Sequence, residues 1–366
     1  MCVLKLFHII FFLNMKYYVD FFVKIVYNSI KERMETMVYW MIVVVVTVIV
    51  LLGVRYIRVK EVGSFPGYLV RVATGFVTYL FRNHTLKLEQ QYKKLNKITE
   101  WKVKEGTYRW YTVKNYTIEG LEASMLTPKK WDNKKILLQL HGGGYEIDLP
   151  YNNLYFAKKY ATLLKTIAVF TINYRVAPEN KYPAALEDAV KAYKWLLEQG
   201  YEPQNIMIVG DSAGGGLAIA TAMYLRDHQI PLPKALITMS AWTDLTNEEA
   251  SFTENYKKDP VFGNSKQSVV YTSTYAEGRN KKDPYISPMY GDFTGLPDML
   301  MQVGTHEMLL SDTTEVAKKA EEAGVLVELD IYEGMFHIFQ KYKGFLPESD
   351  AAWRKVRSFL SQKFYT

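Results

Sequence analysis

The stretch GDSAGGG, residues 210–216, follows directly on the apolar run 206–209. Its first five residues fit the pattern G-x-S-x-G, in which a strand turns sharply into a helix and exposes a serine hydroxyl. Small residues two places before and after the serine keep neighbouring backbone from clashing. The stretch therefore predicts a nucleophile at Ser212, and its extra glycines predict that the helix packs closely beneath it. A phosphate-binding loop is disfavoured, because the stretch contains neither Gly-Lys-Ser/Thr nor G-x-G-x-x-G.

A serine nucleophile needs a base, usually a histidine that is held by a carboxylate. The chain has six histidines, and His337 lies in the segment EGMFHIF just beyond the predicted strand 325–332. Loops at the carboxyl ends of strands are where parallel sheets place catalytic groups. His306 also follows a predicted strand, but it would leave no strand-end carboxylate between Ser212 and the base. We therefore predict His337 as the base.

The carboxylate that holds this histidine is expected between the serine and the base in chain order. The segment GTHEMLLSD, residues 304–312, follows the predicted strand 299–303 and places Glu307 just past the strand end. Asp312 lies five residues later, where a carboxylate can cap the first turn of the next helix. We predict Glu307 as the acid, with Asp312 as the alternative.

A second glycine-rich segment, HGGG at 141–144, follows the apolar strand 135–140. Gly142, Gly143 and Gly144 can present backbone N–H groups to a substrate oxygen without side-chain obstruction. The N–H of Ala213, directly after the serine, would add a further donor. These four residues are the predicted oxyanion hole, and a flexible glycine turn is the alternative interpretation of the HGGG segment.

Strand-like and helical patterns alternate through the rest of the chain. Strands are expected at 108–113, 123–126, 135–140, 167–173, 206–209, 235–239, 299–303 and 325–332, and helices at 153–164, 183–198, 213–227, 312–323 and 349–364. This alternation predicts parallel βαβ units and a sheet covered by helices on both faces, with the first two strands as a hairpin. A polar insertion without a predicted strand runs from 242 to 296, and such insertions usually cover a functional mouth.

The first sixty residues differ from the remainder in charge and hydropathy. They carry eight basic and three acidic residues, so most of the net charge of +7 lies there. Residues 37–54 contain no charge over 18 residues, close to the roughly 20 that span a bilayer. Tyr39 and Trp40 at one end and Arg55 at the other are typical of membrane interfaces. We predict an uncleaved single-pass anchor; a buried strand is the alternative.

The basic excess beside this apolar segment favours lipid headgroups over nucleic acid as a partner. Basic residues flank both ends of the segment, so the side of the membrane stays open, as does the oligomeric state. The one cysteine, Cys2, cannot form an intrachain disulfide or a cysteine-rich metal site.

Five segments in this order resemble the hormone-sensitive-lipase-like (type IV) esterases of the α/β-hydrolase fold: HGGG at 141–144, NYRVAPENKYPAALEDA at 173–189, GDSAGG at 210–215, DPYISP at 283–288 and GMFH at 334–337. The resemblance covers about residue 65 to the C-terminus. Many members of that family have Asp at the acid position, and some have Glu. We therefore interpret Glu307 as a substitution.

The resemblance implies a mostly parallel sheet with flanking helices and a helical cap. We expect an N-terminal segment at 1–60 and a hydrolase domain at 61–366, with a cap from 65–104 and 243–282. The implied activity is hydrolysis of small esters with short to medium acyl chains, through a Ser-His-Glu triad, without metal or cofactor. An amidase or deacetylase with the same triad, and a catalytically silent membrane-tethered binding protein, are the alternatives.

Overall fold

The computed structural model of the chain describes residues 64–81, 104–131, 134–147 and 150–365. The chain divides into two compact units, 1–61 and 62–366, and every described residue belongs to the second. The predicted anchor at 37–54 lies outside the described residues. Among the helices that are described, none combines the length and the apolar character that crossing a membrane requires.

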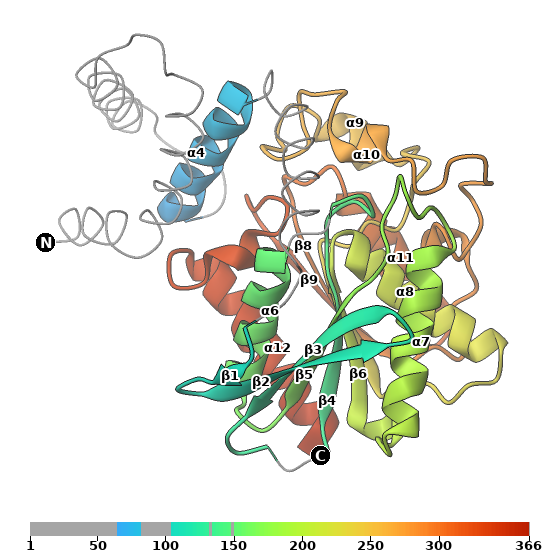
Figure 1. Cartoon of the computed structure of the whole chain (residues 1–366). Coiled ribbons are helices and arrows are strands. Elements are labelled where there is room, and N and C mark those ends of the chain that lie inside the picture. The colour runs from blue at the N-terminus through green and yellow to red at the C-terminus, as the bar shows by residue number, and fades with distance from the viewer. Residues whose placement is uncertain (1–63, 82–103, 132–133, 148–149, 366) are drawn as a thin grey trace, which may run out of the picture. The chain divides into compact units, whose positions relative to one another are not determined.

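The described residues form one nine-stranded sheet in the order β1-β2-β3-β5-β4-β6-β7-β8-β9 (Figure 1). Strands β1, β2, β3 and β5 pair antiparallel in that sequence, and the pairs from β5 through β9 are all parallel. The strands are β1 (Gly106–Thr107), β2 (Tyr111–Ile118), β3 (Leu121–Pro128), β4 (Ile136–Leu140), β5 (Ala168–Asn173), β6 (Ile206–Asp211), β7 (Ala235–Met239), β8 (Asp298–Gly304) and β9 (Val327–Tyr332).

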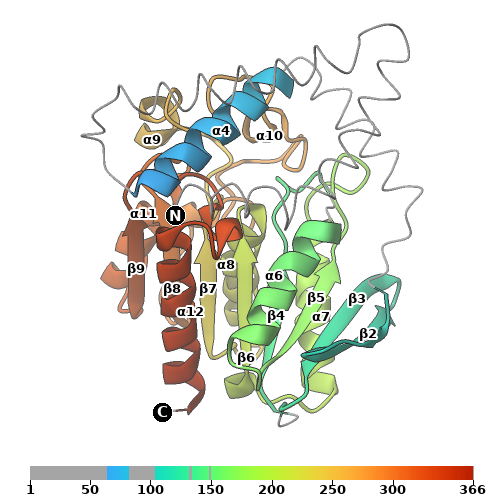
Figure 2. The same cartoon turned by 90° about the vertical axis from the view of Figure 1, so that its left-hand side faces the viewer.

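Helices cover both faces of this sheet (Figure 2). One face packs against α7 (Ala184–Glu198), α8 (Ala213–Asp227) and α11 (Leu310–Glu322), and the other against α6 (Pro150–Leu163) and α12 (Pro347–Tyr365). Successive side chains of a strand point to opposite faces. Ile136 and Leu138 therefore join the first core and Leu137 the second. This double burial explains why the central strands are continuous apolar runs.

The predicted alternation of parallel strands and helices is confirmed, and the differences concern the antiparallel edge. Strands β2 and β3 form the expected hairpin, but they pair from Tyr111 with Pro128 to Ile118 with Leu121, beyond the predicted bounds. Polar residues such as Lys114 and Asn115 hid this extension in the sequence, because one side of an edge hairpin is exposed. The two-residue strand β1 was not predicted.

The insertion between β7 and β8 contains no strand, as predicted, and carries the short helices α9 (Ala250–Glu254) and α10 (Val269–Thr272). Figure 2 shows both at the same end of the sheet as α4 (Phe65–Phe81). On α4, Val70 packs against a cluster that includes Met335 and Phe336. The segments 65–81 and 243–282 thus both contribute to this end of the sheet, whereas 82–103 lies outside the described residues. The boundaries of the cap stay a prediction.

Candidate active site

Ser212 lies at the sharp turn between β6 and α8. Its backbone has φ 54° and ψ −124°, a conformation that costs a residue with a side chain about 1–3 kcal/mol. Neighbouring backbone holds the turn: the Ser212 N–H donates to the Met239 carbonyl at 2.9 Å, and the Ser212 carbonyl accepts from the Trp242 N–H at 2.9 Å. The fold therefore fixes a serine in the strained position that a nucleophile elbow requires.

The glycines around Ser212 are required by close backbone approach. A Cβ atom at Gly210 would lie 2.1 Å from the Gly214 oxygen, and one at Gly214 would lie 2.2 Å from the Leu140 oxygen. At Gly216 a Cβ atom would lie 2.1 Å from the Trp242 oxygen. These distances are far below van der Waals contact with rigid backbone. The prediction that the extra glycines let α8 pack closely is confirmed.

Replacing Gly214 with alanine is expected to destabilise the fold by about 3 kcal/mol, because the new methyl group must displace backbone. Thermal unfolding followed by circular dichroism measures this loss. Gly75→Ala is the matched control: its Cβ atom would meet only Pro260, at 3.5 Å, and alanine favours a helix over glycine. Equal melting temperatures for the two variants would contradict the packing argument.

The three predicted triad residues come together from the loops after β6, β8 and β9. His337 Nε2 lies 3.0 Å from Ser212 Oγ, and His337 Nδ1 lies 3.1 Å from Glu307 Oε2. Ser212 and His337 are 6% and 7% exposed, and Glu307 is fully buried. Both distances are in hydrogen-bond range. The arrangement can move a proton from the serine to the imidazole while the carboxyl group orients the ring.

Hydrogen bonds and burial shift the pKa values of Glu307 and His337. Glu307 Oε1 accepts from the Gly304 N–H at 2.6 Å and from Ser240 Oγ at 2.9 Å. Burial raises the pKa of Glu307, and these two donors oppose that rise. Burial also lowers the pKa of His337, so its imidazole is neutral near pH 7 and can accept a proton.

The HGGG segment lies directly against Ser212. A Cβ atom at Gly142 would come 3.1 Å from Ser212 Cβ. Gly143 and Gly144 have φ of +135° and +64°, where side chains are strained,. Burial raises the pKa of Asp211, and the backbone of Gly142 opposes that rise. Because Gly142 faces this carboxyl group, Gly143, Gly144 and Ala213 are the stronger candidates among the four predicted oxyanion donors.

Comparison with known proteins identifies the family to which this chain belongs. Residues 137–341 match a family described as alpha/beta hydrolase fold. An acetyl-hydrolase of Streptomyces hygroscopicus is 36% identical over 244 residues, which cover 67% of this chain and 81% of the relative. The crystal structure of an esterase from the bacterial hormone-sensitive lipase family is 35% identical, with a TM-score of 0.66 over 71% of this chain and 86% of that chain. This chain belongs to the hormone-sensitive-lipase-like esterases. A hormone-sensitive lipase from a metagenome library, 31% identical, matches with a TM-score of 0.68 over 79% of this chain and 98% of that chain.

In this esterase the alternative acid, Asp312, has another set of partners. It is buried, and its Oδ2 accepts from the N–H groups of Thr243 and Asp244 at 2.7 and 2.8 Å. The Thr243 hydroxyl donates to the Asp312 carbonyl at 2.9 Å. Asp312 thus fixes the chain where it leaves β7, and the structure brings Glu307 to His337.

Two residues at the esterase site were missed from the sequence. Ser240 donates to Glu307 and accepts from the Ile338 N–H at 3.1 Å, so it joins the acid to the loop that carries His337. A polar residue directly after a central strand was the available signal. The centroid of the Phe262 ring lies 4.4 Å from that of the His337 ring. It comes from the insertion, where no periodic pattern indicates which residue faces the site.

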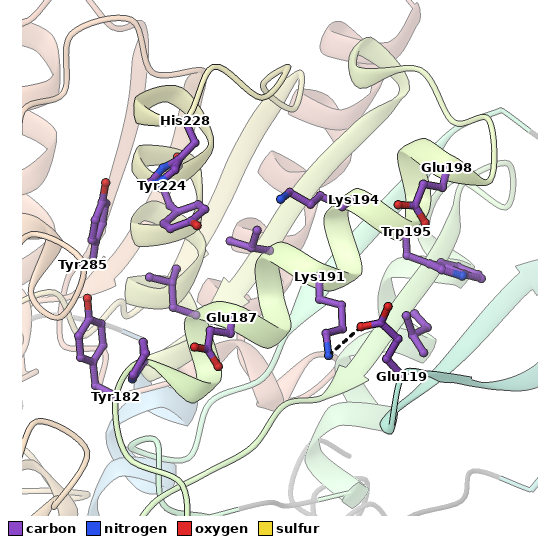
Figure 3. Close-up of a pocket in the computed structure, with 14 residues that line it drawn as sticks. Glu119, Tyr182, Glu187, Lys191, Lys194, Trp195, Glu198, Tyr224, His228 and Tyr285 are labelled. Carbon is purple, nitrogen blue, oxygen red and sulfur yellow. Dashed lines mark hydrogen bonds and ion pairs between the residues drawn. The ribbon is translucent and has the colours of Figure 1, made fainter.

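A groove of about 540 Å³ lies along α7 and the end of α8, away from this site (Figure 3). Aromatic and charged side chains line it, among them Tyr182, Tyr224, Trp195 and Lys191, and Lys191 pairs with Glu119 at 3.3 Å. The triad residues do not line it.

Among the described residues, no three His, Cys, Asp or Glu side chains are grouped so as to hold a metal ion.

Proposed function

We propose that this esterase hydrolyses carboxylic esters with short to medium acyl chains through an acyl-enzyme on Ser212. The observation that carries the proposal is the continuous chain of contacts from Glu307 through His337 to Ser212 Oγ, at 3.1 and 3.0 Å. Both ring nitrogens of His337 are occupied, one by the acid and one by the nucleophile. This is the arrangement that general-base activation of a serine requires.

In the proposed mechanism, His337 Nε2 takes the Ser212 proton as Oγ attacks the ester carbonyl carbon. The carbonyl oxygen becomes an oxyanion, which accepts hydrogen bonds from backbone N–H groups of Gly143, Gly144 and Ala213. The imidazolium then gives its proton to the departing alcohol, and the acyl group stays on Ser212. Water then attacks the acyl carbon while His337 takes its proton, the bond from the acyl carbon to Oγ breaks, and the imidazolium returns the proton to Oγ as the carboxylic acid leaves. Glu307 holds the tautomer of His337 and stabilises the imidazolium in both steps.

Two observations support a small acyl group. A similar protein of Streptomyces hygroscopicus is an acetyl-hydrolase. Bulky side chains from the insertion also approach the site: Phe262 contacts the His337 ring, and Val269 Cγ2 lies 2.3 Å from where a Gly144 Cβ atom would be. We infer that the insertion and α4 together form the cap that limits the space above Ser212.

Hydrolysis of p-nitrophenyl esters from acetate to palmitate tests the proposed substrate class. For the full-length protein in mild detergent, we expect kcat/KM for palmitate to be at least about tenfold below the best short or medium ester, because a confined pocket rejects added methylenes. The acetyl p-nitroanilide serves as the matched amide. Faster release from the anilide than from the acetate ester would favour the amidase alternative. Failure of a fluorophosphonate to label Ser212 would favour the silent binding protein.

We also propose that residues 37–54 anchor the esterase in a membrane as a single pass. The support is the uncharged run of 18 residues with interfacial aromatics at one end and basic residues at the other,. The full-length chain is expected in the membrane pellet after alkaline carbonate extraction, and a chain that lacks residues 1–60 in the supernatant. Equal partition of both chains would contradict an anchor.

A further inference from the structure

Three buried side chains of the insertion, spaced four residues apart, bond to the loop that carries Glu307. Ser251 Oγ donates to the Met308 carbonyl at 2.7 Å. Asn255 Nδ2 donates to the Glu307 carbonyl at 2.8 Å, and also to that of Thr305 at 3.0 Å. Asp259 Oδ2 accepts from the Met308 N–H at 2.8 Å. The backbone on both sides of Glu307 is therefore held by the insertion.

Asp259 is the charged member of this set, and it is only 1% exposed. Besides Met308, it binds its own turn: Oδ1 accepts from the N–H groups of Val261 and Phe262 at 2.7 and 3.0 Å. Burial raises the pKa of Asp259, and the nearby His337 and the three backbone donors oppose that rise,. Asp259 is thus a buried titratable group as well as a structural link.

The same turn also reaches His337 through Phe262. Asp259 fixes the backbone of Phe262, whose ring packs on the imidazole at 4.4 Å and 48°. Besides Glu307, the charged groups that face His337 are Asp259 and Asp211, which raise its pKa, and Lys341, which lowers it. Asp259 is thus linked to His337 indirectly, through Phe262 and through charge.

We propose that Asp259 is a positioning residue of the esterase: it holds the Glu307 loop and Phe262 in register with His337, and its charge stabilises the imidazolium. This inference builds on the proposed function, because during turnover the imidazolium forms when Ser212 gives its proton to His337. Asp259 does not touch the reacting atoms. Its effect is therefore expected on turnover and on the acid–base behaviour of His337, and not on binding of a small ester.

Asp259→Asn, which keeps the shape and removes the charge, tests this role against Asp244→Asn. Asp244 is the matched control: it is a buried carboxylate of the same insertion, 1% exposed, that accepts from the Thr246 N–H at 2.8 Å. For p-nitrophenyl acetate, we expect Asp259→Asn to lower kcat about tenfold with KM nearly unchanged. The pKa of His337, measured from the acid limb of kcat/KM and by imidazole NMR, is expected to fall. Asp244→Asn should change neither.

Phe262→Leu keeps the proposal testable if Asp259→Asn does not fold, because it retains the N–H bonds to Asp259 and removes only the ring contact with His337. It is expected to lower kcat severalfold at an unchanged melting temperature. If Asp259 were purely structural, Asp259→Asn would lower the melting temperature and raise KM together, while the pKa of His337 stayed unchanged. That result would overturn the proposal. The NMR titration does not need turnover, so it tests the role of Asp259 even if the wild-type protein hydrolyses no ester. Inactivity on every ester would refute the proposed function and leave the role of Asp259 to the titration.

Discussion

Replacing Ser212 with alanine is expected to lower kcat for p-nitrophenyl acetate by about a million-fold, the scale at which removal of a triad nucleophile acts. Ser212 Oγ is the atom that lies 3.0 Å from His337 Nε2, so its loss leaves the base with no hydroxyl to deprotonate. The predicted oxyanion donors are backbone groups and survive the change. The variant should therefore still hydrolyse the ester faster than the uncatalysed reaction in water.

The fold should tolerate this change, because alanine adds no atoms and the elbow is held by backbone bonds to Met239 and Trp242. Circular dichroism melting checks that point. Ser358→Ala, at an exposed position of α12, controls for the chemical change at a distant serine and should retain full activity. If Ser212→Ala kept turnover within tenfold of the wild type, the nucleophile would have to be another group.

The strained turn at Ser212 and the proximity of Ser212, His337 and Glu307 could be predicted from the sequence, because each depends on chain order and on local backbone demands. The glycines at 210 and 214 are required because two backbone segments of the chain touch there. The carboxyl ends of parallel strands meet at one edge of the sheet, which brings Glu307 and His337 together with Ser212,. Such constraints are visible in short segments. The same reasoning found the central strands almost to the residue, because strands buried on both faces are continuous apolar runs.

The contributions of the insertion could not be predicted in this way. Asp259 and Phe262 reach the site from a segment without strands, where no period of two or of 3.6 indicates which side chains face inward,. Gly142 shows a second limit: it belongs to the predicted oxyanion motif, yet its backbone faces the Asp211 carboxyl group and opposes the rise that burial causes in the pKa of Asp211. Which backbone donors stay free depends on side chains packed from other segments.

Glu307→Gln is expected to lower kcat by about 10⁴-fold, the effect of neutralising the carboxylate of a triad. The glutamate uses both oxygens: Oε2 faces His337 Nδ1, and Oε1 accepts from the Gly304 N–H and Ser240 Oγ. A glutamine amide has only one oxygen. If that oxygen keeps the Gly304 and Ser240 bonds, its NH₂ group faces Nδ1 and favours the tautomer with the proton on Nε2, which cannot accept from Ser212.

Asp312→Asn is the matched variant that tests whether Asp312, and not Glu307, is the acid. Like Glu307→Gln, it replaces one buried carboxyl group with an amide. Asp312 Oδ2 accepts from the N–H groups of Thr243 and Asp244, so the amide is expected to cost about 1–3 kcal/mol of stability, with kcat within a few-fold of the wild type. Turnover on p-nitrophenyl acetate and urea unfolding, measured on both variants, separate the two effects. A variant pair in which Asp312→Asn lost turnover and Glu307→Gln kept it would move the acid to Asp312. The contacts argue for the first outcome, because the imidazole can be oriented only by a group that reaches Nδ1, and that group is Glu307.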